Sequence, residues 1–184
     1  MTDDYALRFP IGKVGDQQFT GMEPYDEKIK IKALREFQAL PSLLEESVLN
    51  LDASQLQVPY REEGWTIQQV VHHVADSHMN ANVRIKLALT EDNPIIKPYD
   101  QAEWAKLEDT RLVAINVSIT LLHALHERLF VLLESLTPEQ WERTIFHPAQ
   151  NKQVTIWQTL AVYVWHGKHH VAHITGLRNR MNWN

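Results

Sequence analysis

The sequence contains no cysteine, and this absence excludes disulfide bonds, a thiolate nucleophile and every zinc site that uses cysteine ligands. A bound metal ion would therefore be held by imidazole nitrogen or by oxygen. No apolar run approaches the ~20 residues that a membrane-spanning helix needs, so we expect no membrane partner. The first residues, MTDDYALRFPIG, are acidic where a secretory signal is basic, which predicts a cytoplasmic protein.

Basic clusters are also missing from the sequence. The formal net charge is −5, from 18 Lys and Arg against 23 Asp and Glu. Because proteins that bind nucleic acid carry a basic patch, we expect no nucleic-acid partner and instead a small-molecule substrate. With 184 residues, 44% hydrophobic, the composition predicts one globular domain over residues 1–184. Residues 1–23 show no sustained period and are interpreted as an extended N-terminal arm.

Hydrophobic periodicity predicts four long helices in the remaining sequence. Apolar residues recur at spacings of three and four over about 24–48, 67–89, 111–136 and 156–177. Pro41 is expected to kink or split the first of these helices. The long connection 90–110 is interpreted as a lid or rim over a pocket, or as a plain crossover. This pattern predicts an all-α four-helix bundle with long inter-helix connections.

Two similar connectors precede the second and fourth helices. Thr66 and Gln69 have the spacing of a capping box, and Thr155 begins the fourth helix. The segment Asp-Ala-Ser-Gln-Leu from Asp52 leads to Thr66, and Thr-Pro-Glu-Gln-Trp from Thr137 leads to Thr155. This weak repeat fits two similar helical pairs, in which the second and fourth helices meet. The residues after Trp141 through 153 are expected to be irregular.

Histidines are concentrated in the fourth helix, where four of the ten lie between positions 166 and 173. A helix turns by about 100° per residue, so His166 and His170, or equally His169 and His173, project from one face one turn apart. This spacing allows two imidazoles to bind one metal ion. A solvated histidine-rich face is the alternative, but the segment is too apolar for a surface helix. The spacing alone leaves both pairs open.

The second helix offers a further histidine. Relative to the apolar stripe of this helix, His73 borders the core, whereas His72 is expected to point to solvent. His73 is therefore the better ligand, although a buried His73 satisfied by a backbone carbonyl is the alternative. On the third helix, His123 and His126 are interpreted as surface residues.

Three neutral imidazoles from two helices would form an open site for one divalent metal ion per subunit. The remaining coordination positions would be left to water or substrate, as in catalytic zinc sites, and imidazole ligation suits nickel as well. Such an ion can lower the pKa of water or of a thiol. The HExxH motif of metalloproteases is absent, so the general base is unassigned, with Glu62, Glu63, Asp76 and His170 as candidates.

Several segments closely resemble the YfiT group of the DinB-like superfamily, and the similarity runs through most of the chain. They are FPIG at 9–12, GWTI at 64–67, VVHHVADSHMN at 70–80, KPYD at 97–100, YVWH at 163–166 and HHVAHI at 169–174. The resemblance implies a four-helix bundle, a homodimer, and a metal ion, zinc or nickel, held by His73, His169 and His173.

The resemblance implies two metal-dependent activities. The first, which we favour from the sequence, is transfer of a low-molecular-weight thiol such as bacillithiol to an electrophile. The second is hydrolysis by activated water. Arg61, Tyr60 and Arg84 could bind an acidic substrate. A bundle with a purely structural metal is the non-catalytic alternative.

Overall fold

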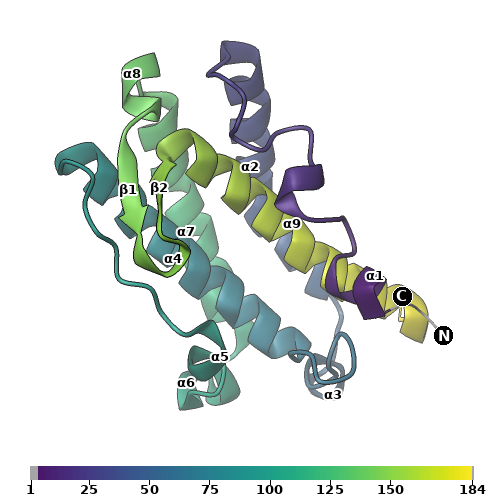
Figure 1. The fold of residues 1–184 in the computed structure, drawn as a ribbon. Helices are drawn as coiled ribbons and strands as arrows, with labels where there is room; N and C mark the ends of the chain where they lie inside the picture. Colours follow the sequence, from purple (N-terminus) through teal and green to yellow (C-terminus); the bar gives the residue numbers. More distant parts are fainter. Residues whose placement is uncertain (1–3, 184) are drawn as a thin grey trace.

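Four long helices form one bundle in the computed structural model, which describes residues 4–183 (Figure 1). They are α2 (Glu27–Val48), α4 (Ile67–Thr90), α7 (Ile115–Glu134) and α9 (Ile156–Met181). Helix α9 packs against α2 and α4, and α7 packs against the same two helices. The predicted four-helix bundle is therefore confirmed, and it brings the second and fourth long helices together.

Side-chain caps fix the starts of α4 and α9. The Gln69 amide donates to Thr66 Oγ1 at 3.2 Å, and the Thr66 amide donates to Gln69 Oε1 at 3.0 Å. Thr155 and Gln158 make the same reciprocal pair at 3.0 and 3.1 Å. Because a capping box satisfies amides that the first turn leaves unpaired, each helix begins at the residue that the sequence predicts.

Of the two outcomes expected at Pro41, a kink or a split of the first long helix, the split does not occur. Helix α2 continues through this buried residue to Val48. Proline has no amide hydrogen, so the carbonyl of Phe37, four residues earlier, loses its helical donor. His126 Nδ1 replaces it at 2.8 Å. The prediction that His126 lies at the surface is therefore wrong, and its side chain is 1% exposed.

Short elements connect the long helices. They are α3 (Ala53–Leu56), α5 (Gln101–Trp104), α6 (Glu108–Leu112), α8 (Pro138–Trp141), η2 (Pro148–Gln150) and the strands β1 (Thr144–His147) and β2 (Lys152–Thr155). The strands pair antiparallel, with Thr144 opposite Thr155 and His147 opposite Lys152. The residues expected to be irregular after Trp141 thus form a hairpin, and the bundle is helical with this one addition among the described residues.

The two connectors that look alike in sequence also fold alike. Both α3 and α8 are one-turn helices with a capping box, Asp52 with Gln55 and Thr137 with Gln140. Each is followed by antiparallel pairing that leads into a long helix, a bridge between Pro59 and Thr66 in the first case and the β1–β2 hairpin in the second. The repeat therefore sets how α4 and α9 enter the bundle.

The N-terminal segment lies along α9 (Figure 1). It is not wholly extended, because it contains α1 (Asp4–Arg8) and η1 (Val14–Asp16). Two indole groups of α9 hold it: Trp165 Nε1 donates to the Gly12 carbonyl and Trp157 Nε1 to the Glu23 carbonyl, both at 3.0 Å. Residues 1–3 of the expected arm are outside the described part of the chain.

Buried apolar residues form two clusters, one toward each end of the bundle. The first includes Phe37, Leu129 and Leu160, and the second includes Leu44, Leu122 and Ile174. Along α4, α7 and α9, His78, His126, His166 and His170 lie between the residues of these two clusters, and His73 lies beside them within the second cluster. His166 is half-buried and the other four are buried. A layer of imidazoles therefore crosses the core, and it contains the candidate site.

Helix α7 is long and apolar enough to cross a membrane by length and composition, with a mean hydropathy of 1.2 over 18 residues. The bundle accounts for part of this character, because Leu122, Leu129 and Leu133 of α7 are buried in the two core clusters, and 28% of the window is buried in all. A single helix of this kind is weak support for membrane insertion, since the core helices of bundles have the same composition.

The junction of α6 and α7 covers one side of α4. His72, which was expected to face solvent, is only 6% exposed because this junction lies over it. Its Nδ1 is 2.7 Å from Ser118 Oγ, and its Nε2 is 3.1 Å from the Val113 carbonyl.

One turn further along α4, burial and the nearby charge of Asp109 raise the pKa of Asp76 to about 6.

Gly167 allows close approach of α9 to α2, which predicts a destabilising effect of Gly167→Ala. An added Cβ would lie 2.6 Å from Leu40 Cδ1 and 3.1 Å from Leu40 Cγ, and Leu40 is buried. We expect a loss of about 1–3 kcal/mol in urea denaturation, as overpacked cores show. The control is Gly176→Ala in the same helix, where the nearest atom is 3.5 Å away and helix propensity predicts a gain of about 0.5–1 kcal/mol. Equal effects at both sites would contradict the close approach.

The raised pKa of Asp76 predicts that the Asp76→Asn substitution stabilises the protein in a pH-dependent way. The folded-state pKa of about 6 lies above the value of the unfolded chain, so the folded protein binds this proton more tightly. Stability from this group is present below pH ~4 and is lost as the pH rises through 6. After a discount for partial exposure, the Asn variant should be more stable by about 1–2 kcal/mol at pH 8. Denaturation at pH 4 should show almost no difference, and an equal gain at both pH values would refute the assignment.

Candidate metal centre

Three imidazoles converge where α4 and α9 meet. His73 comes from α4, and His166 and His170 come from α9, one turn apart. Nε2 of His166 is 3.1 Å from Nε2 of His73 and 3.2 Å from Nε2 of His170. Within residues 4–183, these three side chains form the one group of three or more His, Asp or Glu whose ligand atoms all lie within 4.8 Å of one another.

The donor set fits a divalent metal ion. A tetrahedral ion with metal–nitrogen distances of 2.0–2.1 Å separates its ligand nitrogens by about 3.3 Å, close to the separations in this group. Burial lowers the pKa of His73 to about 4 and the pKa values of His166 and His170 well below their usual range. The rings are therefore neutral near pH 7. Neutral imidazole is the form that binds metal.

The structure does not group the other HxxxH pair with His73. The His169 ring stacks on Trp165 at 4.6 Å between centroids, and the His173 ring stacks on Tyr60 at 3.9 Å. The set of His73, His169 and His173 implied by the resemblance therefore stays a prediction, and the group that converges in the structure is His73 with His166 and His170. His169 and His173 line the same cavity, beside the aromatic rings of the N-terminal segment and the 60–65 loop.

His173 orients one of the three converging histidines. A carbonyl can only accept, so His173 Nε2–H donates to the Arg8 carbonyl at 3.2 Å, and His173 Nδ1 then carries a lone pair. This lone pair accepts from His170 Nδ1–H at 3.4 Å. The proton of His170 is thereby placed on Nδ1, which leaves the Nε2 lone pair directed at the cluster. Such outer hydrogen bonds are typical of metal-binding histidines.

A cavity of about 410 Å³ opens over the three imidazoles. Its walls come from the N-terminal segment, the 60–65 loop and α9, and they include the aromatic rings of Phe9, Tyr60, Trp65 and Trp165. The guanidinium groups of Arg8 and Arg61 also line it. Of the long connection 90–110, Gln101 reaches the cavity, so this connection contributes one side chain to the wall.

The candidates for a general base separate clearly. Glu63 lines the cavity at an exposed position of the 60–65 loop, whereas Glu62 and Asp76 do not line it. His170 belongs to the converging group and is not free to act as a base.

Arg84, which the sequence offers as a contact for an acidic substrate, lies outside this cavity and donates to Tyr163 Oη at 3.2 Å.

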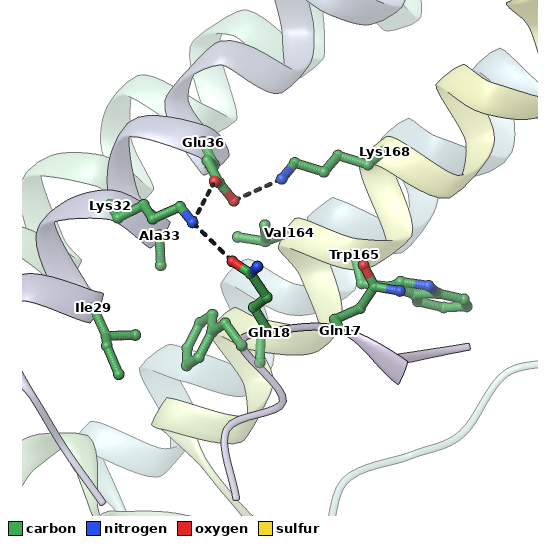
Figure 2. Close-up of a pocket in the computed structure, with 11 residues that line it drawn as sticks. Gln17, Gln18, Ile29, Lys32, Ala33, Glu36, Val164, Trp165 and Lys168 are labelled. Carbon is green, nitrogen blue, oxygen red and sulfur yellow. Dashed lines mark hydrogen bonds and ion pairs between the residues drawn. The ribbon is translucent and has the colours of Figure 1, made fainter. Parts of the chain in front are cut away.

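A second cavity, of about 290 Å³, lies between α2, α9 and the N-terminal segment (Figure 2). Figure 2 shows its charged side chains pairing with one another: Glu36 accepts from Lys168 at 2.6 Å and lies 4.0 Å from Lys32. Lys32 also contacts Gln18 at 3.4 Å. Because these charges are mutually satisfied and no metal-binding group lines this cavity, the histidine cavity is the better candidate for chemistry.

Comparison with known proteins identifies the family. The model of the DinB superfamily matches residues 36–174. A protein of Bacillus mycoides strain KBAB4, named "Putative metal-dependent hydrolase", is 47% identical over 177 residues, which are 96% of this chain and 98% of that protein. A protein of Bacillus cereus strain 03BB102 carries the same name and has the same identity and coverage.

A solved structure agrees with these sequence matches. It is YfiT from Bacillus subtilis, described as "a probable metal-dependent hydrolase with an unusual four-helix bundle topology". The TM-score is 0.92 and the sequence identity is 41%, with 97% of this chain and 99% of that chain covered. By family model, full-length identity and fold, this chain belongs to the DinB superfamily.

Proposed function

We propose that this chain is a metal-dependent hydrolase of small molecules, with one divalent ion held by His73, His166 and His170. The observation that carries the proposal is the convergence of three neutral imidazole nitrogens at the wall of a cavity of about 410 Å³. The full-length relatives named as metal-dependent hydrolases support it.

The ligand set favours a catalytic rather than a structural ion. Structural zinc sites are usually closed by four protein ligands, whereas catalytic sites use three and leave a position open. The converging group has three members in the described residues, and it faces a cavity large enough for water and a small substrate. A structural ion would not require this cavity.

The ion, when bound, would supply Lewis acidity that lowers the pKa of water and polarises a carbonyl. The residues of the chain supply the remaining functions. Arg61 lines the cavity, with its guanidinium 3.7 Å from the Asp4 carboxylate, so it can attract an anionic group of the substrate. The aromatic walls exclude water from one side of the cavity, and Glu63 at its edge can accept a proton.

The relatives favour hydrolysis over the thiol transfer that the sequence analysis preferred. Both reactions use the same open ion, because a metal can stabilise a thiolate as well as activate water. Zinc or nickel as the ion, a homodimer and a cytoplasmic location belong to the same proposal. Each can be measured on purified protein or in cells.

The ligand assignment predicts which histidine substitutions release the metal. His166→Ala and His170→Ala should each weaken zinc affinity by more than about 100-fold, because removal of a ligand should exceed the 10–100-fold effect of removing an outer partner. His169→Ala should stay within about threefold of the parent, because its ring stacks on Trp165 outside the group. Competition with a chromogenic chelator measures all three.

The control for this series is His123→Ala, whose exposed side chain pairs with Glu45 far from the cavity. Loss of zinc from the His169→Ala variant, with His166→Ala unaffected, would restore the alternative pair.

Activity of the zinc- or nickel-loaded protein tests the reaction class. We expect hydrolysis of p-nitrophenyl esters or anilides, abolished in His166→Ala, and reduced about 100- to 10,000-fold in Glu63→Gln if Glu63 moves the proton. A parallel assay uses bacillithiol with monochlorobimane. Conjugation without hydrolysis would establish the transferase instead, and neither activity in a protein that contains its metal would favour the structural alternative.

A further inference from the structure

Two buried histidines lie behind His166 and have no role in the ligand set. His78 is on α4, five residues after His73, and is 0% exposed; His126 is on α7. His78 Nδ1 is 2.8 Å from His126 Nε2, and His126 Nδ1 is 2.8 Å from the Phe37 carbonyl. These contacts link three helices of the bundle, α4, α7 and α2, through two imidazole rings.

The Phe37 carbonyl, at the end of this series of hydrogen bonds, fixes the tautomers of His126 and His78. Because the carbonyl only accepts, His126 carries its proton on Nδ1, and its Nε2 has a lone pair. That lone pair must receive a proton from His78, so neutral His78 is protonated at Nδ1. It follows that Nε2 of His78 is an acceptor. Pro41 makes this arrangement of protons possible, because it leaves the Phe37 carbonyl without its helical donor and so free to accept from His126.

Two buried nitrogens near the metal centre lack partners, and they are complementary. Nε2 of His78 and Nδ1 of His166 are both buried without a hydrogen bond. The two rings are 5.7 Å apart between centroids, tilted by 43°. If His166 binds metal through Nε2, its proton must be on Nδ1, which is then a donor. The rings that carry this acceptor and this donor are neighbours, and leaving both groups unpaired costs about 1–3 kcal/mol for each.

We propose that His78 is a positioning residue of the metal centre, which accepts a hydrogen bond from His166 Nδ1–H directly or through one water. His126 and the Phe37 carbonyl hold His78 in the tautomer that can accept. The proposal rests on the ligand set given above and deepens it. His166 would then be oriented from the core, as His170 is oriented by His173 and the Arg8 carbonyl.

A purely packing role is the competing explanation, because the His126 ring stacks on Phe37 at 4.0 Å and the His78 ring at 6.1 Å. Phenylalanine preserves such stacking but has no nitrogen. Glutamine at position 78 keeps one donor for His126 and one acceptor for His166. Comparing the two substitutions therefore separates ring packing from hydrogen bonding.

Zinc affinity of the full chain is the first test. We expect His78→Phe to weaken it about 10–100-fold and His126→Phe by a smaller factor, with His78→Gln several-fold tighter than His78→Phe. The matched control is His72→Gln, another buried histidine of α4 that bonds to Ser118 and the Val113 carbonyl, and its zinc affinity should match the parent. Thermal unfolding of each metal-free variant checks that it folds.

The second test needs no substitution in the measured protein. Long-range ¹⁵N–¹H correlation spectra of the parent report which imidazole nitrogen carries each proton. We expect protonated Nδ1 and unprotonated Nε2 for both His78 and His126, and protonated Nδ1 for His166 once zinc is added. This spectrum keeps the proposal testable even if a core variant fails to fold.

The outcomes separate the two levels of the proposal. A parent chain that binds no zinc at its histidine group would overturn the ligand set itself. A parent that binds zinc, combined with His78→Phe within twofold of it or with a proton on His78 Nε2, would overturn the positioning role alone. His78→Gln as weak as His78→Phe would also count against the hydrogen bond.

Discussion

The core of this bundle must satisfy a layer of imidazole rings set among apolar side chains. Five histidines from α4, α7 and α9, four of them buried and His166 half-buried, form this layer, and each polar atom left unpaired away from water costs about 1–3 kcal/mol. Backbone carbonyls satisfy the two ends of the layer, at Phe37 on α2 and at Arg8 on the N-terminal segment. Between these ends the nitrogens of His73, His166 and His170 converge, and a cation is the partner that suits three lone pairs at once.

The surrounding structure keeps this layer in register. The capping boxes at Thr66 and Thr155 set the first residue of α4 and α9, and the residues that follow them bring His73 opposite His166. Gly167 lets α9 approach α2 at the level of the layer. The features that position the site are therefore local ones, which act at helix ends and at one point of close contact.

The sequence was sufficient for the parts of the fold that depend on local chemistry. Both helix starts, His73 as a cavity residue and the bundle itself could be predicted from caps and periodicity. The choice between the two HxxxH pairs could not, because both have the same spacing and the answer depends on which side of α9 the helix α4 occupies. His126 was misplaced for a related reason. Its partner is the Phe37 carbonyl, 89 positions away, which Pro41 leaves without a helical donor in a helix that was expected to kink or split.

The two proposed ligands of α9 are held from opposite sides, and this asymmetry bears on how the site assembles. The His166 ring lies 5.7 Å from the ring of His78, which contacts His126, so its surroundings form when α4, α7 and α9 pack. His170 is backed by His173, whose own acceptor is the Arg8 carbonyl of the N-terminal segment. The same segment supplies Arg8 and Phe9 to the cavity wall and is fastened to α9 by the Trp165 indole. The orientation of one proposed ligand and the shape of the cavity are therefore completed by the same step, the docking of the N-terminal segment on α9.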